Sequence, residues 1–313
     1  GRFLGSWVFS RNPRGDIRIK YYQSGGFRLR FGRFRVNDDE EFIPSAAFDN
    51  AVYPFTVPDS VTFYPDTGTA GVDGYAARNI PGGESWAAIR NNAGNYSGYT
   101  ENIVRIGMLA GGAGANTWTC LQRSLFVFPT YGLPDDALIS AAVLSFYGSA
   151  KQNNLAAAAS YNVYAAVTAG QTSITDADYN IANFGAVFSS AKSYSAWSVS
   201  GYNDYILNAN GRAAVSKTGV TKFGGRINHD VNDSHPPWSY AVNLAEAYTS
   251  EQGSGYKPKL VITYSAGETK TSGDGGSGTD AIALRSRGTA DTGNGMDSAF
   301  AAVSIIGEDS GSG

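Results

Sequence analysis

The chain is poor in cysteine, histidine and charge, and each shortage excludes a class of protein. Its single cysteine, Cys120, cannot form an internal disulfide, and two histidines are too few for a zinc cage built on imidazoles. Charged residues make up 16% of the sequence, whereas an average soluble domain has about 25%. Packing or assembly must therefore stabilise the fold in place of disulfides or a structural metal.

Excess charge of one sign and long apolar runs are also missing. The net charge of −3 is too small to attract nucleic acid or an acidic membrane over the whole surface. We therefore expect no nucleic-acid partner, and any electrostatic recognition has to be local. The sequence has no apolar run long enough for a membrane helix, which needs about 18 residues or more. We expect no membrane span.

Glycine and tyrosine are abundant, and together they favour strands joined by tight turns. The chain has 39 Gly and 19 Tyr, whereas the helix formers Glu, Lys, Met and Leu are scarce. With 313 residues it is long enough for one large β domain plus smaller attachments. The composition predicts an all-β protein with one main core.

The chain divides into three predicted regions, of which the first covers residues 1–72. Here IRIKYY at 17–22 alternates apolar and polar positions, and QSGG then turns the chain into FRLRFGRFRV at 27–36. This pattern predicts a β-hairpin, with a bulge at Gly32 where the apolar parity changes. The proline-containing stretch that follows predicts an extended connector.

The second region, residues 73–265, is the predicted main domain, a two-sheet sandwich. Val, Ile, Tyr and Phe dominate its strand-like runs, which recur between turn signals. The runs are RSLFVFPT, ISAAVLSFYG, SYNVYAAVTA, GVTKFGGRI and KPKLVITYS. SITDADYNIANFG predicts a short capped turn or helix, with Thr175 or Asp176 as the cap. VNLAEAYTSEQG predicts one further helical turn.

The run RSLFVFPTYGLPDDALISAAVLSFYG resembles the signature of DNRLRE-type domains. GYAARNIPGGESWAAIRNNAGN upstream and KPKLVITYS downstream look like the opening and closing strands of that family. The resemblance covers about 190 residues and implies a jelly-roll sandwich of the kind found in secreted carbohydrate-associated proteins and phage structural proteins. Phe126, Val127 and Phe128 depart from the Arg-Phe-Asp-like run that the family usually has there. The resemblance therefore implies the fold more than a ligand site.

The third region, residues 266–313, repeats Gly, Asp and Ser. DGGSGTDA, DTGNGMDS and EDSGSG recur with short apolar strands between them. These repeats resemble arrays in tail and appendage proteins of bacteriophages, and each period fits one strand-turn-strand unit. GGSGTDAIA also matches the repeat of calcium-binding β-rolls, although the interval here is about twice the nine residues of a β-roll. The weak Ca²⁺ candidates are Asp274, Asp280, Asp291 and Asp297.

A basic face is predicted on the N-terminal hairpin. It consists of Arg18, Lys20, Arg28 and Arg30, followed by Arg33 and Arg35. Such a face is a candidate contact for a partner subunit, for phosphate or for an acidic glycan. The alternative is a solvent-exposed sheet face, partly neutralised by the acidic residues at 38–41.

Two aromatic and polar clusters are candidate glycan sites. Trp238 ends the polar loop NHDVNDSHPPW and Tyr240 follows it, and Trp197 and Tyr202 lie in SYSAWSVSGYNDY. Flat aromatic faces stack on sugar rings while nearby Asn and Asp side chains bind hydroxyls. The alternative is that these rings belong to the core or to an interface, and burial is favoured for Trp197.

The sequence offers little for metal binding or catalysis. His229, Asp230, Asp233 and His235 could hold a divalent ion if they converged, but they also suit a polar loop. Asp135 and Asp136 lie in a turn without rigid support for glycoside hydrolysis, and Cys120 has no nearby histidine to activate it. No GxSxG, HExxH or P-loop motif occurs. We expect no enzyme, no catalytic residue and no cofactor.

Two functional hypotheses remain. The first is a bacteriophage virion appendage or decoration protein, such as a tail, neck or head fibre, that forms a homo-oligomer with other virion chains. The second is a carbohydrate-binding module of a secreted bacterial surface protein. Both place the chain on a virion or outside the cell, and they can coexist. Because the chain begins at Gly1 and stops within a repeat, we expect a segment of a longer polypeptide.

Overall fold

A computed structural model of the chain describes two compact units. Its side chains are described for residues 59–65, 70–112, 114–155 and 157–265, and outside these ranges only the strands within 8–9, 16–22, 40–43, 55–56 and 300–306 are described. One unit comprises Gly1–Val61, Leu133–Ser140 and Thr263–Gly313, and the other comprises Thr62–Gly132 and Ala141–Ile262.

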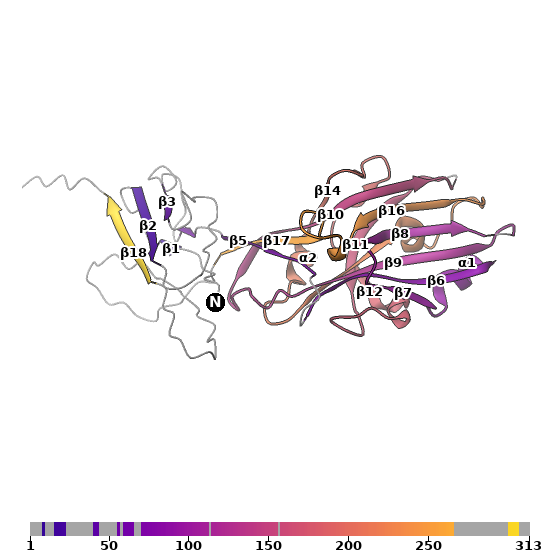
Figure 1. Ribbon diagram of the computed structural model, residues 1–313, viewed down its shortest axis with the longest axis horizontal. Helices are drawn as coiled ribbons and strands as arrows, with labels where there is room; N and C mark the ends of the chain where they lie inside the picture. The colour runs from indigo at the N-terminus through magenta and orange to yellow at the C-terminus, as the bar shows by residue number, and fades with distance from the viewer. Residues whose placement is uncertain are drawn as a thin grey trace, which may run out of the picture. The chain divides into compact units, whose positions relative to one another are not determined.

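The protein is an all-β sandwich built on a sheet of 13 strands (Figure 1). The path of the sheet is β12-β11-β15-β9-β8-β16-β10-β17-β5, and β6, β7, β13 and β14 branch from it. The strands are β5 (Asp59–Phe63), β6 (Val72–Glu84), β7 (Tyr96–Gly98), β8 (Ile103–Gly111), β9 (Trp118–Phe128), β10 (Leu138–Asn153), β11 (Ser160–Ala166), β12 (Phe184–Val187), β13 (Lys192–Ser193), β14 (Tyr202–Ile206), β15 (Thr221–Ile227), β16 (Val242–Tyr248) and β17 (Lys259–Ser265). The predicted all-β fold is confirmed.

Helices are few and short within the described residues. They are α1 (Trp86–Asn91), η2 (Asp176–Tyr179), η3 (Ile181–Asn183), α2 (Ala209–Ala213), α3 (Asn228–Val231) and η4 (Ser250–Gln252). Thr175 is the N-cap of η2, and its backbone N–H donates to the Asp178 carboxylate at 2.7 Å, so the predicted capped turn is confirmed. The predicted helical turn in VNLAEAYTSEQG is wrong for its first half, which forms β16.

The core is centred on β9, which is buried along almost its whole length. β9 pairs with β6, β8 and β15, and these pairings surround it. Successive residues of β9 are buried on both of its faces, so its end LFVF does not alternate between apolar and polar residues. Phe126 lies 4.5 Å from Phe146 on β10 between ring centroids, and Phe146 lies 5.8 Å from Tyr205 on β14. These rings fill the space between the layers.

Two smaller sheets involve the ends of the chain. β18 (Phe300–Ile306) and β3 (Glu40–Ile43) pair with opposite edges of β2 (Asp16–Tyr22), and β1 (Val8–Phe9) pairs with β4 (Phe55–Thr56). The sequence pattern predicted residues 27–36, which lie outside the described residues, as the partner of residues 17–22. The prediction missed that both edges of β2 are occupied by β3 and β18. It also missed that a strand of the repeat segment pairs with the N-terminal region.

Candidate functional site

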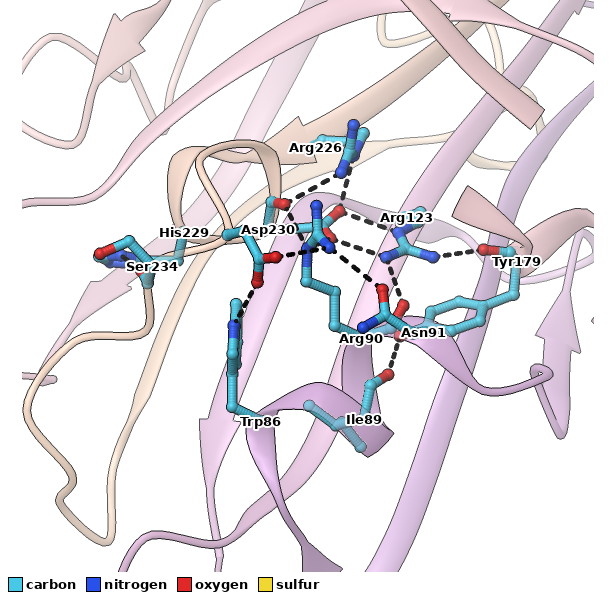
Figure 2. A network of polar contacts seen from close by, with 11 residues as sticks. Trp86, Ile89, Arg90, Asn91, Arg123, Tyr179, Arg226, His229, Asp230 and Ser234 are labelled. Carbon is cyan, nitrogen blue, oxygen red and sulfur yellow. Dashed lines mark hydrogen bonds and ion pairs between the residues drawn. The ribbon is translucent and has the colours of Figure 1, made fainter. Parts of the chain in front are cut away.

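The chain leaves β15 through α3 and a loop that reaches β16, and residues 228–241 form the candidate site. Here arginine side chains from three elements, α1, β9 and β15, converge on the carboxylate of Asp230 on α3 (Figure 2). Arg123 of β9 donates from Nε and Nη2 to the two Asp230 oxygens at 2.8 and 2.7 Å. Arg226 of β15 donates from Nε to Oδ2 of Asp230 at 2.6 Å. Asp230 and Arg123 are fully buried.

The two arginines determine the charge state of Asp230. Burial by itself would raise the pKa of Asp230, because a carboxylate loses its hydration. The hydrogen bonds and positive charges of Arg123 and Arg226 outweigh burial and lower that pKa to about 2. Asp230 is therefore ionised at every ordinary pH, and its oxygens are occupied by guanidinium N–H groups.

Arg123 also joins α1 and η2 to the sheet. It donates to the backbone carbonyl of Arg90 at 2.9 Å and to that of Tyr179, and its guanidinium lies 4.2 Å from the centre of the Tyr179 ring. The Tyr179 hydroxyl donates to the carbonyl of Ile89. One buried cation thus fixes both short helices against β9.

Asp233 connects this buried network to the surface. Its carboxylate accepts from the indole N–H of Trp86 at 2.8 Å and forms an ion pair with Arg90 at 3.2 Å. Arg90 also donates to the backbone carbonyl of Asp230 at 2.9 Å. The backbone of Asp233 has a φ of 50°, a left-handed conformation that Asp tolerates better than most residues. Asp233 therefore ties the loop to α1.

Aromatic side chains surround this attachment point. We call Trp86, His235, Trp238 and Tyr240 the aromatic rim. The rings of Trp86 and His235 lie 5.8 Å apart, and each packs against the buried Trp118, at 5.8 and 5.6 Å respectively. Trp238 is half-buried and donates from its indole N–H to the carbonyl of Thr117 at 3.0 Å. Tyr240 is 79% exposed.

The end of the loop lies against the hairpin between β8 and β9. The backbone N–H of Gly111 donates to the carbonyl of Ala241 at 2.8 Å. A Cβ atom at Gly111 would lie 1.8 Å from the carbonyl oxygen of Ser239, so only glycine allows this approach. The aromatic rim is thus held by backbone contacts at one end and by the ion network at the other.

The two predicted glycan clusters do not come together. Trp197 is 1% exposed and packs against Tyr161, so its ring is not available to a ligand from solvent. This candidate is corrected: the indole fills the core beneath β11. Tyr202 is half-buried on β14 and contacts Tyr147 at 5.2 Å, in a group of tyrosines that includes Tyr248 and Tyr256.

The register of β16 separates Tyr202 from the aromatic rim. Val242, just after Tyr240, pairs with Ala110, whereas Tyr248 pairs with Ile103 at the other end of β8. The Tyr202 hydroxyl is also used within the protein, because it donates to the carbonyl of Gly255 at 3.0 Å. Of the four predicted glycan residues, Trp238 and Tyr240 therefore lie just before the start of β16, whereas Tyr202 belongs to the tyrosine group at its end.

The four residues weighed as a divalent-ion site, His229, Asp230, Asp233 and His235, have other partners in the structure. Asp230 points at the arginines, His229 faces the carbonyl of Ser234, and His235 stacks between tryptophans. Over the described ranges, no group of three or more His, Cys, Asp or Glu residues could hold a metal ion. The calcium candidates Asp274, Asp280, Asp291 and Asp297 lie outside the described residues, as do Arg28 and Arg30. Arg18 and Lys20 lie on β2, whose side chains are not described.

Residues considered for catalysis are placed as follows. Cys120 is buried on β9, and burial raises the pKa of its thiol to about 11. Asp135 and Asp136 lie in the turn between β9 and β10.

In the part of the chain that the structure describes, no helix is long and apolar enough to cross a membrane.

Sequence reasoning missed Arg123, Arg226, Arg90 and Trp86 as parts of the site. A signal existed for Arg123, since a charged residue within the buried strand LQRSLFVF requires a partner. No local pattern identified Asp230, which lies 107 residues further along the chain, as that partner.

Comparison with known proteins adds no relative. No protein-family model matches the chain, and a search of curated proteins found no match. Among solved structures, the one titled "Structure of infectious bursal disease virus Gt strain" is 8% identical, with 86% of this chain and 78% of that chain covered. Its TM-score of 0.12 supports no statement on fold or function. Membership in the DNRLRE family stays a prediction.

Proposed function

We propose that the chain is a non-enzymatic structural and adhesion protein that binds carbohydrate through its aromatic rim. The observation that carries the proposal is the exposed ring of Tyr240 beside the half-buried Trp238, on a loop whose base is fixed by buried ion pairs. Tyr240 presents most of its ring to solvent, and Trp238 lies two residues before it on the same loop. Aromatic rings beside polar groups are the surface that pyranose rings require.

Rigidity supports binding at this surface. A preorganised loop loses less conformational entropy when a ligand binds, so more of the contact energy remains as affinity. Here Asp233 ties the loop to α1, and Gly111 ties it to the β8–β9 hairpin. Asn116 and Thr117 lie in the β8–β9 hairpin, and Asp233 lies in the loop. We expect their polar groups to bind sugar hydroxyls.

The biological setting we propose is a bacteriophage virion appendage or decoration protein. Its support is the sequence of residues 266–313, whose Gly, Asp and Ser repeats resemble those of phage appendages. The alternative setting is the surface of a bacterium, with the sandwich as a secreted carbohydrate-binding module. Electron microscopy of the native source separates the two, because only the first predicts labelling of virus particles by an antibody against this chain.

The binding experiment is a glycan array followed by calorimetry on the best glycan. We expect Tyr240→Ala to weaken binding about tenfold, because loss of one stacking ring removes about 1.4 kcal/mol. Tyr131→Ala is the matched control, since Tyr131 is 54% exposed on a turn outside the rim. An array without hits for the wild type, or equal affinity of Tyr240→Ala and Tyr131→Ala, would contradict the proposal.

A further inference from the structure

His229 is a buried histidine at the junction between the ion network and the aromatic rim. It lies on α3, directly before Asp230, and is 6% exposed. Its Nδ1 lies 3.2 Å from the carbonyl oxygen of Ser234 (Figure 2). Because a carbonyl oxygen only accepts, Nδ1 must carry the proton in this arrangement.

The other ring nitrogen of His229 has no such contact. Nε2 is buried and has no hydrogen-bond partner among the described residues. In the neutral tautomer Nε2 is an uncharged, unprotonated acceptor, and its burial costs less free energy than the burial of a charged N–H group would. Protonation would place a charged N–H group at a point where no acceptor receives it, and an unpaired buried charge is strongly unfavourable.

The charges around His229 do not compensate for a further proton. Three arginines lie around α3, namely Arg123 of β9, Arg226 of β15 and Arg90 of α1. The negative charges are the carboxylates of Asp230 on α3 and Asp233 in the loop, and the loop also contributes the imidazole of His235. β11, which also packs against α3, carries no charged side chain. Three guanidinium groups already face two carboxylates, so an imidazolium would add to an excess of positive charge.

We propose that protonation of His229 detaches the loop at residues 232–238, so that His235 and Trp238 of the aromatic rim are held in place at neutral pH and released in mild acid. The inference rests on the proposed function in naming what the loop carries, and it describes the regulation of that site. Detachment breaks the contacts of Ser234 with His229 and of Asp233 with Trp86, while the Asp230 network remains.

The direction of the pH dependence follows from the folded state. Burial lowers the pKa of His229 below its ordinary value of 6.5, the bond to Ser234 opposes this, and His235 adds to the lowering. The closed loop therefore binds fewer protons than the open one. Its stability is complete above about pH 6.5 and declines as the pH falls from there towards the lowered pKa. Asp230 stays ionised throughout, since its pKa is about 2.

The test measures the loop directly, without a ligand. Hydrogen exchange of residues 228–241 is followed in the full chain at about pH 7.5 and about pH 5, after correction for intrinsic exchange, together with tryptophan fluorescence. We expect at least a tenfold loss of protection in acid for the wild type, because the lowered pKa of buried His229 makes the open loop the form that binds the proton. The chain has two histidines, so the source of the change can be assigned by substitution.

His229→Asn keeps an N–H donor near Nδ1 and cannot be protonated, so its loop protection should not change with pH. His229→Gln serves the same purpose if the Asn variant does not fold, and His235→Asn, the matched control, should respond like the wild type. An unchanged wild-type loop at pH 5, or an acid response that persists in both His229 variants, would overturn the inference. Failure to bind any glycan at pH 7.5 would instead contradict only the proposed function.

Discussion

At the scale of single residues, Asp230 is the acceptor that makes a charged core possible. Arg123 and Arg226 come from neighbouring strands, and each would be an unpaired buried cation without this carboxylate. Replacing a whole buried ion network by apolar residues can be neutral, but removing one partner leaves the others uncompensated. The network is therefore most vulnerable at its single buried anion.

The first prediction is that Asp230→Asn lowers the free energy of unfolding by about 3–5 kcal/mol, because two buried guanidinium groups lose their counter-charge. Asp233→Asn is the comparison, since the Asp233 side chain is 57% exposed, and it should cost under about 1 kcal/mol. Urea unfolding monitored by tryptophan fluorescence measures both. Similar losses for the two variants would refute the central role of Asp230.

The lowered pKa of Asp230 also predicts how the stability of the protein changes in strong acid. Its pKa is lowered from 3.8 to about 2, so the folded state holds the carboxylate ionised where the unfolded state protonates it. This contribution to stability is complete above the unfolded pKa and is lost as the pH falls through 3.8 towards 2. Acid unfolding curves of the wild type and Asp230→Asn should therefore converge towards pH 2.

The second prediction concerns the thiol of Cys120. Because the side chain is buried and its pKa is raised to about 11, the reactive thiolate is scarce and shielded near neutral pH. A thiol reagent such as iodoacetamide should leave the native protein unlabelled and modify it once urea unfolds the chain. Mass spectrometry of the intact protein reports the outcome, and rapid labelling of the native state would show that the thiol is accessible.

At the scale of elements, the surroundings of each strand outweigh its local propensity. VNLAEAY has the composition of a helix, yet it forms β16 because it pairs with β8 on one side and β10 on the other. A central strand gains backbone hydrogen bonds and packing on both edges, which exceed the small differences in propensity. The hairpin between β8 and β9 likewise depends on a glycine, because a side chain at Gly111 would overlap the loop of residues 239–241.

The third prediction tests that close approach. Gly111→Ala should lower the free energy of unfolding by about 1–3 kcal/mol, because its methyl group would overlap the carbonyl of Ser239 and displace the loop. Gly82→Ala is the matched control, since a Cβ there meets nothing within 4 Å, and it should change stability by no more than about 0.5 kcal/mol. Thermal unfolding compares them. The proposed function adds that Gly111→Ala weakens glycan binding.

At the scale of the whole molecule, the two ends of the chain meet in small sheets. Among the described strands, β2 pairs with β3 and β18, and β1 pairs with β4. An isolated two-stranded sheet is at best marginally stable in water. Association with other copies of the chain stays a prediction from the sequence.

The fourth prediction is therefore a homo-oligomer. The mass of the full chain, measured by light scattering or sedimentation equilibrium, should be a multiple of 33.0 kDa. Charge-reversing substitution of Arg18 and Lys20 on β2 tests whether the predicted basic face makes the contact, and should shift the mass towards that of one chain. A monodisperse monomer across micromolar concentrations would contradict the prediction.

The sequence by itself determined the all-β class, the capped turn at Thr175 and the strands β9, β10, β11, β15 and β17 of the sandwich. These follow from short-range patterns, since alternation of apolar residues and glycine-rich turns are local properties. Only the tertiary structure decided that Asp230 meets Arg123 and Arg226, that Trp197 is core while Tyr240 is exposed, and that β18 joins β2. These contacts join residues that are far apart in the chain. Burial and charge pairing in the folded state determine them, so a local sequence pattern does not identify them.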